Sequence, residues 1–372
     1  MEHIKTGSQL NGILQWVQEV GASDLHLQET KPARYRVEGR LKVAPAETVP
    51  TLNREGLLAL LAETLSAPAV EEIRRKTEVD LSLQMGTTRW RANFSKQQGR
   101  QSCSFRVVPK HSLRLRDLRL PVTLKDVLRL PRGLVLVTGP TGQGKSTTVR
   151  ALLQEINATQ ARRIITIEDP IEFLFDDELS QFEQREVGID TASFADGIRN
   201  AMRQDPNVIF VGEIRDRESI FAAMQAAETG HLVFTTLHAD SVAQAVGRIR
   251  EYYPASEQDN ISSLLARNIN MIVCQRLVPD VDDRQIPCLE ILKRDPTIQD
   301  AIVKNELNRL TEILEVCNHQ GMHSFDQYLI ELMAAGVVSQ ATARTYAVSR
   351  HRLEMLIAGY QSSQSILLPE RR

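Results

Sequence analysis

The chain has 372 residues, of which 42% are hydrophobic and 25% are charged, and its formal net charge is −2. This length predicts two or three domains, and the composition excludes a chain that is disordered throughout. A net charge so close to zero excludes binding of polyanions through an overall positive charge. It does not exclude a local basic surface.

The cysteines and the hydropathy pattern bear on the cellular compartment. Cys103, Cys274, Cys288 and Cys317 are widely spaced and form no C-x-x-C pair, which argues against a disulfide scaffold and against a four-cysteine zinc site. No apolar run is long enough to span a bilayer, and residues 1–18 lack the pattern of a signal peptide. We therefore expect a cytoplasmic protein with reduced thiols, whose contact with a membrane is indirect.

The first part of the chain, residues 1–109, is predicted to form a small α+β domain. Apolar residues at helical spacing from Leu10 to Val17 predict a helix with Ser8 as its N-cap and Gly21 at its end. A helical pattern with a break near Ala67-Pro68 covers residues 57–76. Alternating patterns predict strands around residues 24–27, 35–37, 41–43, 90–94 and 103–107, with a tight turn at Glu38-Gly39.

Residues 110–131 are predicted to form a linker before the next domain. Seven basic side chains lie in or next to it: Lys110, Arg114, Arg116, Arg119, Lys125, Arg129 and Arg132. We expect most of them to lie on a solvated connector. The alternative interpretation is a basic surface that faces a bound polyphosphate or a neighbouring subunit.

From residue 132 to residue 372 the pattern indicates a parallel-sheet α/β domain. Short, nearly continuous apolar runs alternate with helical patterns, as is typical of buried parallel strands with helices on both faces. These runs are residues 134–137, 164–167, 208–211 and 232–235. From about residue 292 the chain is predicted to be a helical subdomain, with caps at Ser324 and Ser339 and a helix end at Gly336.

A phosphate-binding loop follows the first of these strands. Residues 139–146 fit the pattern G-x-x-x-x-G-K-[ST], and a helical pattern over residues 147–156 comes directly after them. Glycines let the backbone N–H groups point inward, and the start of the helix adds the positive end of its dipole. Lys145 is expected to reach the β- and γ-phosphates, and Ser146 to bind Mg²⁺. The expected nucleotide-binding residues are Gly139, Pro140, Thr141, Gly142, Gln143, Gly144, Lys145, Ser146 and Thr147.

A nucleoside triphosphatase also needs carboxylates to hold the metal and to orient water. Glu168 and Asp169 follow one buried strand, and Glu213 follows another, with Gly212 where many such strands carry an aspartate. We predict that Glu168 polarises the attacking water and that Glu213 serves the magnesium side, through water. The sequence leaves the reverse assignment open.

Histidines and arginines complete the list of candidate catalytic residues. His231 and His238 flank one buried strand, and a neutral histidine there suits a hydrogen bond toward phosphate or a carboxylate better than it suits a metal. The alternative for each histidine is a purely structural role. Arginines that stabilise transition-state charge are expected among Arg89, Arg91 and Arg106 of the first domain, or Arg215 and Arg217 after the second acid.

Together these residues resemble the secretion ATPase superfamily, and within it the type IV pilus retraction ATPases. The segments that resemble its Walker A, Asp, Walker B and His boxes are Gly139–Thr147, Thr166–Phe173, Gln184–Val187, Asp205–Arg217 and Ala226–His238. Residues 22–27, 89–94 and 105–106 are similar to the first domain of that family. The resemblance covers about residues 20–355, and it is far more specific than the phosphate loop alone.

The resemblance implies a PAS-like first domain joined to a RecA-like ATPase domain. It implies a homohexamer that couples Mg²⁺-dependent ATP hydrolysis to pilus disassembly and twitching motility. The motor would lie at the cytoplasmic side of the inner membrane, beneath a platform protein, with a paralogous retraction ATPase as a further partner and no nucleic acid. Carried onto this chain, it assigns nucleotide contacts to residues 142–147 and catalysis to Glu168 or Glu213, to the three arginines of the first domain and to both histidines.

Two features of the sequence bear on the branch of the superfamily to which the chain is similar. Extension motors are typically longer and carry a four-cysteine zinc element, which this chain lacks, so the retraction branch is favoured. Retraction motors usually carry an Ala-Ile-Arg-Asn-Leu-Ile-Arg-Glu stretch, whereas residues 301–308 read Ala-Ile-Val-Lys-Asn-Glu-Leu-Asn. An accessory retraction ATPase therefore stays open. A nucleic-acid translocase on the same core and a non-hydrolysing ring subunit are the remaining alternatives.

Overall fold

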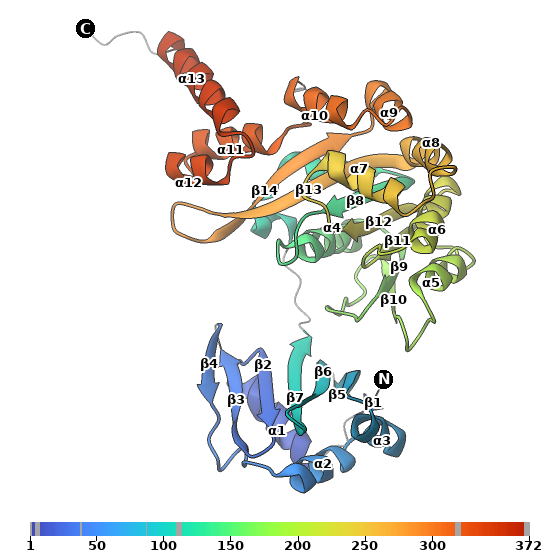
Figure 1. The fold of residues 1–372 in the computed structure, drawn as a ribbon, viewed down its shortest axis with the longest axis vertical. Helices are drawn as coiled ribbons and strands as arrows, with labels where there is room; N and C mark the ends of the chain where they lie inside the picture. Colours follow the sequence, from blue (N-terminus) through green and yellow to red (C-terminus); the bar gives the residue numbers. More distant parts are fainter. Residues whose placement is uncertain are drawn as a thin grey trace. The chain divides into compact units, whose positions relative to one another are not determined.

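The computed structural model describes residues 2–3, 8–37, 39–86, 88–108, 114–316 and 321–367, with residues 2–3 and 360–367 as backbone only (Figure 1). The chain divides into two compact units, and each is treated by itself. The first comprises residues 1–111 and 170–174, and the second comprises residues 112–169 and 175–372. The predicted turn residue Glu38, the linker residue Lys110 and Cys317 lie outside the described residues.

The first unit is built on a mainly antiparallel sheet with the strand order β1-β5-β6-β7-β2-β3-β4, in which only β1 and β5 pair in parallel among the described residues. The strands are β1 (Glu2–His3), β2 (Asp24–Gln28), β3 (Lys31–Val37), β4 (Arg40–Val43), β5 (Glu78–Met85), β6 (Thr88–Gln97) and β7 (Arg100–Val108). Trp90, Phe94 and Phe105 are buried at alternating positions of β6 and β7. The rings of Phe94 and Phe105 meet edge to face at 5.9 Å.

Three helices pack with this sheet: α1 (Gln9–Glu19), α2 (Arg54–Ala62) and α3 (Ala67–Arg75). Ser8 caps α1 by accepting a hydrogen bond from the Asn11 N–H at 3.2 Å, as predicted. The predicted break between the two later helices is confirmed, since α3 begins at Ser66 as N-cap with a proline in its first turn.

The second unit contains a sheet with the order β10-β9-β11-β12-β8-β13-β14, parallel except for the β13–β14 pair. Its strands are β8 (Gly133–Thr138), β9 (Arg163–Glu168), β10 (Gln181–Glu186), β11 (Val208–Val211), β12 (Leu232–Leu237), β13 (Ile269–Pro279) and β14 (Gln285–Lys293). The four predicted apolar runs are the buried strands β8, β9, β11 and β12, so the predicted parallel-sheet fold class is confirmed. The β13–β14 hairpin was not predicted, because polar residues such as Gln275, Arg276 and Glu290 interrupt its apolar pattern.

Two groups of helices pack against this sheet, and the helices within each group contact one another. One group is α4 (Lys145–Thr159) with the 3₁₀ helices η1 (Leu115–Leu118) and η2 (Val122–Arg129), and the other is α5 (Phe194–Ala201), α6 (Arg217–Glu228), α7 (Val242–Glu251) and α8 (Gln258–Asn268). Residues 115–129 belong to the segment predicted as a linker, but they form 3₁₀ helices. Their apolar side chains, among them Leu124 and Val127, are buried in the core of the second unit.

The C-terminal part is helical, as predicted. Its helices are α9 (Pro296–Val303), α10 (Leu307–Val316), α11 (Phe325–Ala334), α12 (Gln340–Tyr346) and α13 (Arg350–Leu367). Ser324 and Ser339 cap α11 and α12 with their side chains, and Gly336 has φ = +69° just after α11. Helix α11 packs against β14.

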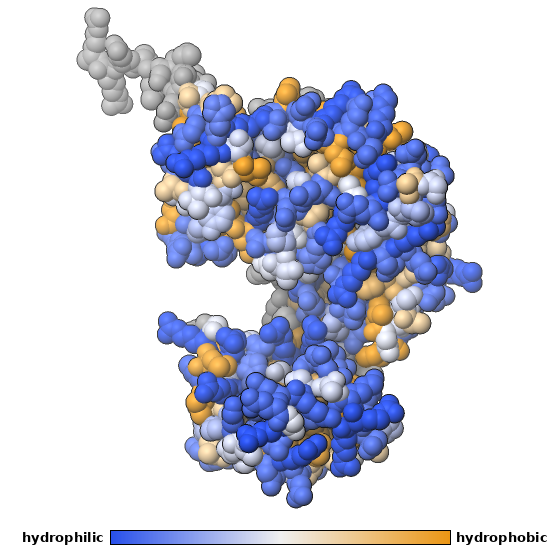
Figure 2. All heavy atoms as spheres, viewed as in Figure 1, coloured by the Kyte–Doolittle hydropathy of each residue, from blue (hydrophilic) through white to orange (hydrophobic). Residues whose placement is uncertain are grey.

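The surface seen in Figure 2 is mostly hydrophilic, with small separate apolar groups. Across the residues that the structure describes, we find no helix both long and apolar enough to cross a membrane.

Candidate active site

The loop between β8 and α4 has the geometry of an anion cradle. Gly139, Gly142 and Gly144 adopt φ values of +144°, +79° and +76°, which residues with a side chain rarely adopt. A Cβ atom on Gly139 would lie 2.3 Å from the carbonyl oxygen of Gln275, so this position has no room for a side chain. Among the described residues no side chain caps the start of α4. The first N–H groups of the helix are therefore available to an anion.

Lys145 crosses this loop from the first turn of α4. Its Nζ atom donates to the carbonyl oxygens of Gly139 at 2.7 Å and of Pro140 at 2.9 Å. Burial lowers the pKa of Lys145 from its usual value. The ammonium group is thus held over the mouth of the cradle by two neutral acceptors, for which phosphate oxygens are stronger substitutes.

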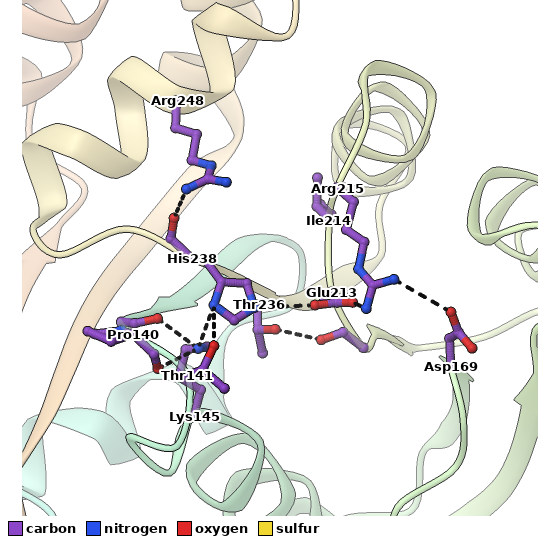
Figure 3. Close-up of polar contacts among 12 residues, drawn as sticks. Pro140, Thr141, Lys145, Asp169, Glu213, Ile214, Arg215, Thr236, His238 and Arg248 are labelled. Atoms are coloured by element: carbon purple, nitrogen blue, oxygen red, sulfur yellow. Dashed lines mark hydrogen bonds and ion pairs between the residues drawn. The ribbon is translucent and has the colours of Figure 1, made fainter. Parts of the chain in front are cut away.

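His238, at the end of β12, links this lysine to an acid (Figure 3). Its Nδ1 atom lies 3.4 Å from Lys145 Nζ and 3.5 Å from Thr141 Oγ1, and its Nε2 atom lies 3.4 Å from Glu213 Oε2. Burial, followed by the charges of Lys145, Arg248 and Arg215, lowers the pKa of His238, so the ring is neutral at pH 7. A neutral ring with its proton on Nε2 satisfies both neighbours, because Nδ1 accepts from the lysine and Nε2 donates to the carboxylate.

Glu213 lies just beyond β11, where several charged side chains meet. Its carboxylate forms an ion pair with Arg215, whose Nη1 atom lies 3.8 Å from Asp169 Oδ2 (Figure 3). The hydroxyl of Thr236 on β12 donates to the carbonyl oxygen of Gly212 at 2.6 Å and ties the end of β11 to the neighbouring strand. The structure therefore brings Lys145, His238 and Glu213 together in one cluster.

Glu168 ends β9, which pairs with β11 in a register that matches Ile167 with Val211. Its carboxylate is buried and accepts hydrogen bonds from Thr166 Oγ1 at 2.7 Å and Gln184 Nε2 at 3.2 Å. A Cβ atom on Gly212 would lie 3.4 Å from the Cα and 3.8 Å from the Cγ of Glu168, so glycine leaves space beside this side chain. The two predicted acids thus follow neighbouring strands at the same edge of the sheet. Thr166 and Gln184, which orient Glu168, were not predicted to have this role.

The other candidate histidine, His231, lies outside this cluster. His231 precedes β12, its Nδ1 atom lies 2.9 Å from the carbonyl oxygen of Ala226, and Gly133 at the start of β8 donates to its carbonyl oxygen. A strand of six residues is about 20 Å long, so His231 is at the opposite edge of the sheet from Lys145. His231 is thus not part of the Lys145–His238–Glu213 cluster, and its predicted catalytic role stays a prediction.

The arginine candidates differ in how they are held. In the first unit, Arg89 is buried and donates to Ser82 Oγ at 3.1 Å. Arg106 donates from Nε to Asp24 Oδ1 at 2.6 Å. Arg91 is half-buried and is the register partner of Arg106. After the second acid, Arg215 joins the Glu213 cluster. Arg217 instead pairs with Glu257 and lies over the ring of Tyr253.

Three polar side chains hold the phosphate loop against β13, and two of them, Gln275 and Thr148, had no predicted role. Gln275 Nε2 donates to the carbonyl oxygen of Gln143 at 2.6 Å, and Thr148 Oγ1 donates to Gln275 Oε1 at 2.7 Å. Gln143 Oε1 accepts from the Leu277 N–H at 2.6 Å. The side chain of Gln143 therefore fixes the loop, although the pattern G-x-x-x-x-G-K-[ST] does not specify this position. Ser146 and Thr147 follow, partly buried, in the first turn of α4.

Replacing Gln275 by alanine is expected to loosen this loop. The change removes one buried and one partly buried hydrogen bond and leaves Thr148 Oγ1 unsatisfied, which costs about 2 kcal/mol in the free energy of unfolding. We expect the affinity for ADP to fall about fivefold, which corresponds to about 1 kcal/mol. Calorimetric titration of ADP and urea unfolding measure the two effects, and exposed Arg294→Ala is the control. An unchanged ADP affinity would contradict a role of Gln275 in the loop.

A cavity of about 410 Å³ opens beside the loop. Its walls include Gly144 and Thr147 of the loop and helix, Leu277 and Asp280 of the hairpin, and Arg119 after η1. Asp280 binds Arg119 at 3.1 Å across this wall. The cavity continues from the anion cradle and has a size that suits a small organic ligand.

Comparisons with known proteins identify the family of this chain. Residues 5–356 match the family described as Type II/IV secretion system protein. The chain is 36% identical to the type IV pilus retractation ATPase PilT of Pseudomonas aeruginosa over 328 residues, which are 88% of this chain and 94% of that protein. It is 34% identical to the type IV pilus ATPase PilU of the same organism over 347 residues, 93% of this chain and 90% of that protein.

A crystal structure of the pilus retraction motor PilT with bound ADP superposes on this chain with a TM-score of 0.83 at 35% identity, covering 93% of this chain and 99% of that one. The resemblance inferred from the sequence boxes is therefore confirmed, and the chain is a nucleotide-binding ATPase. It belongs to the Type II/IV secretion system protein family.

Proposed function

We propose that this chain is an ATP-hydrolysing motor that powers the retraction of type IV pili. The observation that carries the proposal is the cluster in which Lys145, on the phosphate loop, contacts His238, and His238 contacts Glu213. Relatives that are pilus retraction ATPases, matched over most of both chains, support the link from ATP hydrolysis to pili.

The loop residues are proposed to bind the phosphates of ATP. The N–H groups of residues 142–147 face the β- and γ-phosphates, and Lys145 exchanges the carbonyl oxygens of Gly139 and Pro140 for phosphate oxygens. The cavity beside Thr147 and Leu277 takes the nucleoside. Since Lys145 already lies across the loop, phosphate binding needs only a short movement of its side chain.

The donor set suits Mg²⁺. The described residues contain no group of three or more His, Cys, Asp or Glu side chains that would hold a metal alone. This agrees with Mg²⁺, which is usually held by one or two protein oxygens together with phosphates and water. We assign the hydroxyl of Ser146 and, through water, Glu213 to the metal, which when bound neutralises charge on the β- and γ-phosphates.

The neighbouring side chains are proposed to polarise the attacking water and to stabilise the charge that develops on the γ-phosphate. Glu168, oriented by Thr166 and Gln184, is proposed to polarise the water. His238 is proposed to hold Glu213 and Lys145 in register with the γ-phosphate. Among the arginines of the first unit, Arg91 is the favoured source of further positive charge, because Arg89 is buried and Arg106 is engaged by Asp24.

The assembly and location are proposed from the relatives. We propose a homohexamer at the cytoplasmic side of the inner membrane, working on a platform protein and beside a paralogous ATPase. The domain assignment that goes with it is a PAS-like domain over residues 1–109 and a RecA-like domain over residues 132–372.

One observation keeps the accessory role as a second candidate. Residues 301–308, which differ from the usual retraction-motor stretch, form the end of α9, a turn with Asn305 at φ = +57°, and the start of α10. The identities to PilT and PilU, 36% and 34%, do not separate the two roles.

Deletion of the gene in its host tests the proposal and separates the roles. We expect more surface pili together with lost twitching motility, because pili that extend normally are no longer withdrawn. Normal pilus number with reduced motility would indicate the accessory role. Loss of all pili would contradict retraction and indicate extension. Counts of pili by electron microscopy and the width of surface spreading zones measure the outcome.

A further inference from the structure

The loop that carries His238 is fixed along its backbone by side chains from several elements. Arg248 donates to the carbonyl oxygen of His238 at 2.6 Å (Figure 3). Thr138 Oγ1 donates to the carbonyl oxygen of Ala239 at 3.0 Å. Glu290 of β14 accepts from the N–H of Val242, the first residue of α7, at 2.7 Å. A loop held at successive peptide groups has little freedom, so its anchors decide where the imidazole of His238 lies.

One anchor of this loop also contacts the C-terminal helices. Arg276 on β13 donates from Nη2 to the carbonyl oxygen of Asp240 at 2.9 Å. The same guanidinium lies over the ring of Phe325, with its central carbon 4.5 Å from the ring centroid. Arg276 is therefore shared between the peptide two residues after His238 and the first residue of α11.

Phe325 is itself firmly placed. Its side chain is buried, and its carbonyl oxygen accepts from Cys288 Sγ at 3.9 Å, where Cys288 is the register partner of Arg276 in the hairpin. Ser324 caps α11 through a reciprocal pair of hydrogen bonds with Gln327. A shift of α11 would therefore move the ring on which the guanidinium of Arg276 rests.

We propose that Arg276 is a positioning residue through which helix α11 sets the orientation of His238. The inference rests on the proposed function, because it assigns the C-terminal helices an influence on the hydrolytic site. The proposed role of Arg276 involves no contact with the nucleotide or the reacting atoms. Arg276 fixes the peptide of Asp240 and thereby the imidazole of His238, which contacts Lys145 and Glu213. Loss of the guanidinium or of the aromatic ring releases the same loop.

Turnover of the full chain tests this coupling in a double-mutant cycle. We expect Arg276→Ala to lower kcat for ATP about tenfold with little change in KM, and Phe325→Leu to lower it about threefold. In a His238→Ala background, each change is expected to alter kcat less than about twofold, because the residue through which it acts is gone. Arg294→Ala, an exposed arginine just after β14, is the matched control and keeps wild-type turnover.

A second readout does not depend on hydrolysis. Diethyl pyrocarbonate modifies exposed neutral imidazoles, and mass spectrometry of the digested chain gives the rate at His238, with His351 as an internal reference. We expect this rate to rise at least about threefold in Arg276→Ala and Phe325→Leu and to stay unchanged in Arg294→Ala, since the freed ring leaves Lys145 and Glu213.

The outcomes separate this inference from the proposed function. An equal loss of kcat for Arg276→Ala with and without His238, or an unchanged modification rate at His238, overturns the positioning role. Wild-type turnover in Phe325→Leu beside a loss in Arg276→Ala overturns the link to α11. Absence of ATP hydrolysis by the unmodified chain would instead refute the proposed function, and the modification rates would still decide the coupling.

Discussion

Lys145→Ala is expected to lower ATP turnover at least about a hundredfold, because it removes the positive charge that the structure holds over the phosphate loop. The affinity for ADP is expected to fall about tenfold. Steady-state phosphate release at saturating ATP and calorimetric titration of ADP measure the two effects.

The control for this change is a lysine outside the loop. Lys304→Ala removes an exposed side chain that pairs with Asp300 at 2.9 Å one turn away, and we expect it to keep wild-type turnover. Because Lys145 is buried against two carbonyl oxygens, thermal unfolding of the alanine variant should be recorded as well. Turnover above half of the wild-type rate in a folded Lys145→Ala protein would contradict the assignment of the loop.

Glu168→Gln and Glu213→Gln are each expected to bind ATP normally and to lower kcat about a hundredfold. The amide keeps the size of the side chain but neither takes up a proton nor balances a cation. The two variants should differ in their need for metal. If Glu213 serves Mg²⁺, Glu213→Gln raises the Mg²⁺ concentration for half-maximal turnover about tenfold, while Glu168→Gln leaves it unchanged.

Titration of Mg²⁺ at fixed ATP distinguishes these assignments. Glu257→Gln, an exposed acid that pairs with Arg217, is the matched control and should behave as wild type. A raised Mg²⁺ requirement in Glu168→Gln alone would exchange the two roles. Normal turnover in both variants would remove the carboxylates from the mechanism altogether.

The parts of the site that the sequence predicts are those encoded by neighbouring residues. The phosphate loop is one short pattern between a strand and a helix, and the acids follow apolar runs that are recognisable as buried strands. The carboxyl ends of parallel strands meet at one edge of a sheet, so the meeting of Lys145 with Glu213 follows once the sheet is predicted.

The parts that escaped prediction depend on contacts between distant residues. Thr148 and Gln275 are 127 positions apart, and their hydrogen bond exists only because β13 pairs with β8. No local pattern marks Gln275 or Arg276, since the function of each comes from the strand beside it. His231 shows the opposite case: the length of β12 places it and His238 at different ends of one strand, and the sequence already contained that information.

The most direct measurement is a crystal structure of the full chain with ADP and Mg²⁺. Our account predicts the β-phosphate inside residues 139–147, with Lys145 Nζ bound to its oxygens instead of to the carbonyls of Gly139 and Pro140, and the metal beside Ser146. A diphosphate bound elsewhere, or a Lys145 that keeps both carbonyl partners with the nucleotide present, would contradict it.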